Sequence, residues 1–236
     1  MNTVLHRANT RGYADHDWLK TYHTFSFAAY RNPERDHFGT LRVLNDDLIT
    51  PGTGFRRHPH QNMEIISIPL SGTLEHTDNM GNITVIREGE IQIMSAGTGV
   101  YHSEYNKSRK EPASFLQIWI EPDLKNADPR YDQISLKHNR SFTHMEPVIS
   151  PEKNGKGLWI HQKAWLTLCE PVTGQSYTYN LHDKGNGVYL FVIEGEIRTG
   201  DKVLYRRDGM GIWNTGKFTV TSRYETKLLL IEVPMK

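Results

Sequence analysis

Histidine and carboxylate side chains at spacings of two residues form the most chemically suggestive pattern in the chain. His58 and His60 flank a proline, and His102 and Glu104 flank a serine. On an extended strand the side chains at i and i+2 project from one face, so each pair is expected to point in one direction. Imidazole and carboxylate groups in this ratio suit a divalent transition metal. The pattern therefore indicates a metal site with positions left open for a substrate and dioxygen.

A single histidine pair at this spacing has a simpler explanation. The chain has 12 histidines among 236 residues, so some pairs two residues apart arise by chance, and an isolated pair is more often a surface feature than a metal site. Here there are two such pairs, and a glycine-rich turn precedes each of them, Gly52-Thr53-Gly54 in one case and Gly97-Thr98-Gly99 in the other. The repetition favours the metal site over coincidence.

The elements that must position these residues are predicted to be strands. Apolar residues recur with a period near two in segments rich in Val, Ile, Thr and aromatics, and glycines interrupt the pattern every several residues. These segments are residues 63–76, 83–94, 113–122, 187–200, 202–214 and 217–233. The best helical candidates are short, around residues 14–20 and 129–133, and neither could form a core alone. The sequence predicts an all-β protein.

Two stretches of the chain resemble each other. Residues 71–94 and 194–213 both run strand, glycine turn, strand, glycine turn, strand. Each set of hairpins must close on others to cover its edges, so the repeat predicts two copies of one β-barrel unit. The polar stretch 124–151 is expected to join them. This places one domain at residues 1–135 and the other at 136–236.

The two histidine segments resemble the two conserved boxes of the cupin superfamily. The matching residues are Gly52, His58, His60, Glu64 and Gly72 in the first box and Gly99, His102 and Asn106 in the second. The pattern departs from most cupins in having Gly97 at the place of a proline and a longer gap after Gly89. These departures are similar to the pirin family of two-domain cupins, and the likeness covers most of residues 11–122. The resemblance implies two cupin barrels in tandem.

The pirin resemblance also implies a metal held by three histidines and a glutamate. Carried over to this sequence, the ligands are His58, His60, His102 and Glu104. Glu64 is then expected to support a ligand from behind, with direct ligation as the lesser alternative. One divalent ion per chain is expected, iron first, with nickel, cobalt, manganese, copper and zinc as alternatives. The second barrel has no histidine pair at residues 186–190, so no metal is expected there.

The chain is most similar to bacterial pirins that act as quercetin 2,3-dioxygenases. This implies that a flavonol binds through its 3-hydroxyl, that Glu104 takes the hydroxyl proton, and that dioxygen opens the ring with release of carbon monoxide. The substrate-binding residues cannot be named from the sequence. An alternative is a regulator that senses the redox state of iron and binds a transcription factor or a metabolic enzyme. A third possibility is a metal-free storage or sugar-binding cupin.

The overall composition restricts the partners and the compartment. With 28 Lys and Arg against 27 Asp and Glu, no direct nucleic-acid or anionic membrane partner is expected. The single cysteine excludes an internal disulfide. The first twenty residues lack the apolar core of a secretory signal, and no stretch approaches about 20 apolar residues. These features favour a cytoplasmic location.

Several other residues are expected to have structural roles. His161 and His182 are interpreted as ordinary histidines. His23 is expected to be half-buried and hydrogen-bonded, His76 to face solvent, and Cys169 to be a small buried apolar residue. Four aromatic residues are expected in the core or in the lining of a pocket, namely Phe25, Phe27, Phe55 and Trp119.

Overall fold

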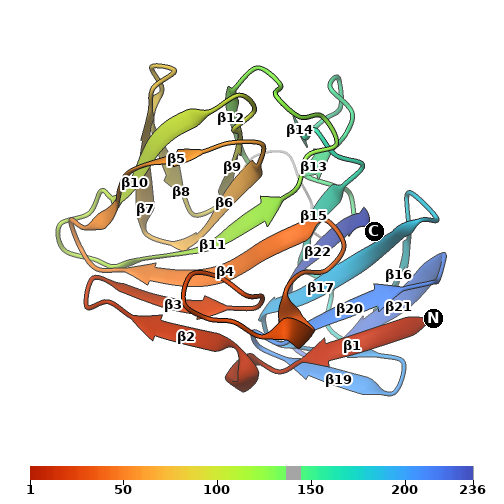
Figure 1. Cartoon of the computed structure of the whole chain (residues 1–236). Coiled ribbons are helices and arrows are strands. Elements are labelled where there is room, and N and C mark those ends of the chain that lie inside the picture. The colour runs from red at the N-terminus through yellow and green to blue at the C-terminus, as the bar shows by residue number, and fades with distance from the viewer. Residues whose placement is uncertain (137–144, 236) are drawn as a thin grey trace.

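Strands make up almost all of the regular structure (Figure 1). The computed structural model describes residues 1–136 and 145–235. Within these ranges the only helical elements are two short 3-10 helices, η1 (Ala8–Thr10) and η2 (Pro33–Arg35). The prediction of an all-β chain is confirmed.

The two helical candidates were wrong. Residues 14–20 include the end of β2 (Gly12–Asp15) and the start of β3 (Leu19–His23), and residues 129–133 overlap β12 (Arg130–Ser135). Each of these strands is paired along its length with a neighbour. Segments of this length are marginal as isolated helices, and the ladder of a sheet supplies the backbone hydrogen bonds instead.

The first half of the chain builds a barrel from two sheets. The larger sheet has the strand order β12-β9-β6-β11-β4-β3-β2, and the smaller has the order β5-β10-β7-β8. A buried cluster with members on both sheets, among them Ile49, Leu74 and Phe115, fills one end of the interior. The remaining strands are β4 (Leu41–Ile49), β5 (Gly54–His60), β6 (Glu64–Ser71), β7 (Thr73–Asp78), β8 (Ile83–Arg87), β9 (Glu90–Ser95), β10 (Val100–Asn106) and β11 (Ala113–Ile120).

The second half repeats this arrangement. Its larger sheet has the order β1-β20-β17-β22-β15-β13-β14, and its smaller sheet has the order β16-β21-β18-β19. The strands are β13 (Ile149–Ser150), β14 (Leu158–Trp159), β15 (Trp165–Cys169), β16 (Ser176–Asn180), β17 (Asn186–Glu194), β18 (Glu196–Thr199), β19 (Lys202–Tyr205), β20 (Gly209–Trp213), β21 (Lys217–Ser222) and β22 (Lys227–Pro234). The prediction of two cupin barrels in tandem is confirmed.

One strand lies outside the half to which its sequence position assigns it. β1 (Asn2–His6) pairs antiparallel with β20, so it extends the large sheet of the second barrel. Figure 1 shows this red strand beside the blue strands of the second half. The pairing ties the start of the chain to its end.

The two larger sheets pack against each other and share one core. A buried cluster joins Leu44, Ile66 and Leu116 of the first half to Phe191 and Leu229 of the second. Sheets that are covered on both faces are made of strands that are apolar at successive positions. This explains the continuous apolar runs in β6, β17 and β22.

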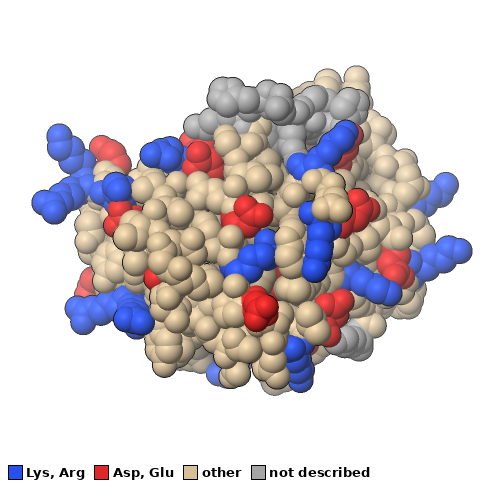
Figure 2. All heavy atoms as spheres, turned by 90° about the horizontal axis from the view of Figure 1, so that it is seen from above, with Lys and Arg blue, Asp and Glu red and all other residues tan. Residues whose placement is uncertain are grey.

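The remaining general expectations concern the cysteine and the surface. Cys169 is buried in the second barrel, as predicted, and burial raises the pKa of its thiol to about 12. No helix among the described residues is both long and apolar enough to cross a membrane. On the face that Figure 2 shows, basic and acidic side chains are interspersed, in keeping with their nearly equal numbers.

Candidate metal centre

Three imidazole rings meet in the first barrel. His58 and His60 come from β5, His102 comes from β10, and one ring nitrogen of each lies within 4.8 Å of those of the other two. The ring centroids are 4.5 Å apart for His58 and His102, 4.8 Å for His58 and His60, and 4.9 Å for His60 and His102. The three histidines of the two sequence segments therefore come together, as predicted.

Strand register and glycine explain the convergence. β5 and β10 are antiparallel neighbours in which His58 stands directly opposite His102. A side-chain carbon at Gly54 would collide with the backbone carbonyl oxygen of Glu104, so glycine allows the close approach of the two strands. The turn before β10 needs glycine as well, since Gly97 has a positive φ of 47°. An irregularity in the ladder between His102 and Glu104 then changes the partner of Glu104 to Phe55.

The ring nitrogens are in the state that metal binding requires. Burial, together with the neighbouring imidazoles, lowers the pKa of both His60 and His102 to about 3, so these rings are neutral near neutral pH. His58 Nδ1 lies 2.7 Å from the backbone carbonyl oxygen of Arg56 and donates to it, which leaves Nε2 with the free lone pair. His102 Nε2 is buried and has no hydrogen-bond partner. An unpaired buried acceptor beside two other imidazoles fits a bound cation.

Glu104 is the fourth predicted ligand, and it belongs to an adjoining group. Its carboxylate is buried and accepts hydrogen bonds from Ser67 Oγ at 2.8 Å, Gln92 Nε2 at 2.9 Å and Gln117 Nε2 at 2.7 Å. Glu104, His102 and His76 form a second set whose potential ligand atoms lie within 4.8 Å of one another. His102 is common to both sets, so it links Glu104 to the other two histidines.

His76 was wrongly expected to face solvent. It is fully buried inside the barrel, and its ring centroid lies 5.3 Å from that of His102. The sequence contained a signal for this position. Along β7 the buried positions alternate, and His76 shares the inward face with the apolar Leu74.

A hydrogen-bonded chain connects His102 with a carboxylate. His76 Nε2 lies 2.9 Å from Asp78 Oδ2, and His76 Nδ1 lies 3.5 Å from His102 Nδ1. Burial alone would raise the pKa of Asp78, but hydrogen bonds from His76 and Asn82 outweigh it and lower the pKa, so the carboxylate is charged. A charged Asp78 requires His76 Nε2 to donate, and in the neutral form of His76 the Nδ1 atom is then the acceptor for His102 Nδ1–H. His102 Nε2 is then the atom with the free lone pair.

We expect His76→Phe to weaken metal binding about 10- to 100-fold, because the variant keeps a ring of similar size but cannot fix the orientation and tautomer of His102. Competition with a chromophoric chelator measures the affinity. His182→Phe, in the second barrel, is the matched control. An affinity for His76→Phe equal to that of the wild type would show that the chain to Asp78 plays no part in binding.

Glu64 does not reach the histidines. Its carboxylate accepts a hydrogen bond from Ser95 Oγ at 2.9 Å, and within the described chain it has no hydrogen bond with His58, His60, His102 or Glu104. Ile65 points into the barrel, so its neighbour Glu64 points with Ile66 toward the interface between the two large sheets. Glu64 therefore does not contact a predicted ligand from behind, as the sequence had led us to expect.

The buried Glu64 carboxyl gives a pH-dependent prediction. Burial raises its pKa to about 7 from 4.5. The folded chain thus holds this proton more tightly than the unfolded chain, and the associated stability is full below pH 4.5 and is lost as the pH rises through about 7. Glu64→Gln removes the titration and keeps an acceptor for Ser95. The free energy of unfolding of the variant, measured relative to that of the wild type, should therefore rise by about 3 kcal/mol from about pH 5 to about pH 8.

Urea unfolding of both proteins at the two pH values measures this difference. Glu75→Gln, a partly exposed carboxylate paired with Lys107 at 2.6 Å, is the control and should show little change. If the difference in unfolding free energy between wild type and Glu64→Gln did not change with pH, the raised pKa of the Glu64 carboxyl would be contradicted.

The aromatic residues and the other histidines named in the sequence analysis lie partly beside the metal centre and partly elsewhere in the fold. Trp119 packs edge-on against His60 with centroids 4.9 Å apart, and Phe27 packs edge-on against Trp119 at 5.4 Å. Phe25 lies in the core between the barrels, and Phe55 packs between Trp18 and Phe115. His23 is hydrogen-bonded to Asn45, as expected, but it is buried rather than half-buried. His182 pairs with Glu232, and His161 packs against Trp159.

Two all-β barrels in tandem, with clustered imidazoles inside the first, define a two-domain cupin. Comparison with known families agrees, since residues 4–120 match the Pirin model and residues 147–233 match the model of the quercetinase C-terminal cupin domain. The chain is 37% identical over 230 residues to a quercetin 2,3-dioxygenase of Escherichia coli strain K12, a match that covers 98% of both chains. This chain belongs to the pirin family.

Other relatives extend the comparison. A pirin-like protein of Caulobacter vibrioides is 37% identical over 94% of this chain and 95% of its own. Among solved structures, the bacterial pirin YhhW of Escherichia coli in complex with nickel(II) superposes with a TM-score of 0.94 at 36% identity and covers both chains completely. These likenesses support a single divalent metal in this chain as well.

Proposed function

We propose that this chain is a metal-dependent dioxygenase that opens a flavonol such as quercetin with dioxygen and releases carbon monoxide. The observation that carries the proposal is the cluster of His58, His60 and His102, with the buried carboxylate of Glu104 next to it. The names of the similar proteins, several of which are called quercetin 2,3-dioxygenase, support the same chemistry.

The burial of the cluster is uneven, which favours access by a substrate. His102 and Glu104 are buried, whereas His58 and His60 are only partly covered. Trp119 lies beside His60 and provides an aromatic surface next to the open side. A planar, polycyclic phenol suits a site with a polar end and an aromatic wall.

The residues of the metal centre would bind the ion and accept a proton. His58, His60, His102 and Glu104 would hold the ion, iron first among the candidates. A bound cation supplies Lewis acidity, which favours the ionised form of the 3-hydroxyl. Glu104 would accept the hydroxyl proton, while its three hydrogen-bond donors keep the carboxylate in place.

The two barrels would have different roles. We assign the metal centre to the N-terminal unit, residues 1–135, and a supporting role to the C-terminal unit, residues 136–236, whose large sheet covers that of the first barrel. β1 is an exception to this division, because it completes the sheet of the second unit.

Incubation with quercetin under air tests the activity. Protein reconstituted separately with iron, nickel, cobalt, manganese or copper should form carbon monoxide and the ring-opened depside with at least one of them. Failure with every metal would overturn the dioxygenase proposal. The alternative of an iron-dependent regulator would then predict that a protein partner binds the ferrous and ferric forms with different affinity.

A further inference from the structure

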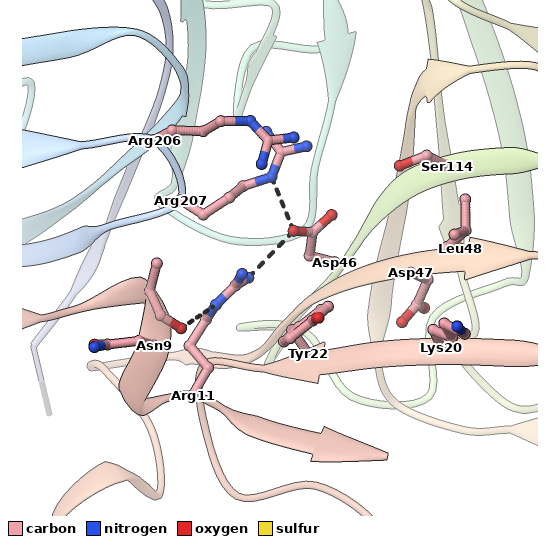
Figure 3. Close-up of a pocket in the computed structure, with 11 residues that line it drawn as sticks. Asn9, Arg11, Lys20, Tyr22, Asp46, Asp47, Leu48, Ser114, Arg206 and Arg207 are labelled. Carbon is pink, nitrogen blue, oxygen red and sulfur yellow. Dashed lines mark hydrogen bonds and ion pairs between the residues drawn. The ribbon is translucent and has the colours of Figure 1, made fainter. Parts of the chain in front are cut away.

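A cavity of about 500 Å³ lies between the two halves of the chain, and none of the metal-cluster residues lines it (Figure 3). Its walls come from the segment after β1, from β3, β4 and β11 of the first barrel, and from the turn between β19 and β20 of the second. A site assembled from both halves is a common position for a small ligand.

One wall of the cavity is cationic. Arg11 Nη1 lies 3.3 Å from Asp46 Oδ2, and Arg207 Nε lies 2.8 Å from the same oxygen. The side chains of the two arginines are only 6% and 8% exposed. Figure 3 shows them approaching Asp46 from opposite sides, with Arg206 beside Arg207. Two nearly buried guanidinium groups thus share one carboxylate.

The cationic wall has unused hydrogen-bond donors. Within the described residues, the Nη2 atoms of Arg11 and Arg207 have no hydrogen-bond partner, and neither is among the buried unpaired atoms, so both reach open space. Arg206 uses Nε for Glu194 Oε2 at 2.7 Å. Its two terminal nitrogens have no partner in the described chain. Four basic side chains line the cavity, Arg11, Arg206, Arg207 and Lys20, against the carboxyl groups of Asp46 and Asp47 and of Glu194, which pairs with Arg206. This leaves an excess of positive charge.

Away from the arginines the lining of the cavity is mixed, with Lys20 and Asp47 beside the apolar surface of Tyr22 and Leu48. Tyr22 and Leu48 line it and remain 41% and 38% exposed. The Arg11 guanidinium lies over the Tyr22 ring, 4.9 Å from its centroid, so the two walls meet at this pair. An exposed ring and an aliphatic side chain beside a cationic edge offer a surface for a flat apolar group.

We propose that this cavity binds a small aromatic carboxylate. The carboxylate accepts hydrogen bonds from the free guanidinium nitrogens, which match its planar geometry, and the ring lies against Tyr22 and Leu48. The repulsion from Asp46 is limited, because both arginines already neutralise that carboxylate. The volume is in the range of small-molecule sites, which is about 300 to 1,000 Å³. The site is independent of the proposed dioxygenase activity.

Titration calorimetry with the metal-loaded protein tests the proposal, with benzoate as the probe. Benzyl alcohol is the ring without the charge, and acetate is the charge without the ring. We expect benzoate to bind at least about tenfold more tightly than either. Equal affinity for benzoate and either analogue would overturn the proposal.

Two variants locate the binding. Arg206→Gln should weaken benzoate binding about tenfold. Arg223→Gln, which is similarly exposed and also paired with a glutamate, should leave it unchanged. His58→Ala should retain benzoate binding, which distinguishes the cavity from the metal centre. Unchanged affinity in Arg206→Gln, or loss of binding in His58→Ala, would refute the site.

Discussion

His58→Ala is expected to reduce the bound metal from about one ion per chain to almost none. The variant removes one of three clustered imidazoles. In the wild type, His58 Nδ1 donates to the carbonyl oxygen of Arg56, so the lone pair on His58 Nε2 is available to the metal. A site that loses one of its few protein ligands loses most of its affinity. Because His58 is partly exposed, the barrel should remain folded.

Elemental analysis of the purified protein measures this loss, with circular dichroism to verify the fold. His102→Ala should behave in the same way, whereas His161→Ala, in the second half, is the control and should retain the ion. Added metal should also raise the melting temperature of the wild type but not of His58→Ala. A metal content near that of the wild type in both variants would exclude this cluster as the binding site.

Glu104→Gln is expected to lower kcat for quercetin opening by a factor of about 10² to 10⁴ while the fold is preserved. An amide cannot accept the proton of the 3-hydroxyl, and positioned general bases contribute about this much. The amide oxygen can replace Oε1 as the acceptor for Ser67 and Gln92. Gln117 can reverse its own amide to accept from the new NH₂ group.

Two further measurements separate the roles of Glu104. Metal content shows whether the carboxylate is needed to hold the ion, and kcat per bound metal shows whether it is needed for the reaction. Gln117→Ala is the control, because it adds no charge and removes only one of the three hydrogen bonds to the Glu104 carboxylate. Full activity per bound metal in Glu104→Gln would contradict its role as the proton acceptor.

The fold class and the common direction of the side chains within each two-residue pair were predictable from the sequence, because they depend on local periodicity. That the two pairs meet depends on the register of β5 against β10. Alternation with period two fixes which residues share a face of a strand, so His58 was expected to point with His60. The same rule placed His102 and Glu104 on one face of β10. It was not applied to β7, where the apolar Leu74 marks the inward face, and for that reason His76 was assigned to solvent.

The positions of Glu64, β1 and the arginine-lined cavity were decided only by the tertiary structure. Period-two alternation shows that Ile65 and Glu64 face opposite sides of a sheet, but not which side is the barrel interior and which the interface, since both are buried. β1 pairs with a strand about 200 residues further along the chain. Arg11 and Arg207 likewise meet at Asp46 only because the two barrels pack together. A linear pattern of residues carries no information about such distant contacts, because they depend on how the completed sheets fit against each other.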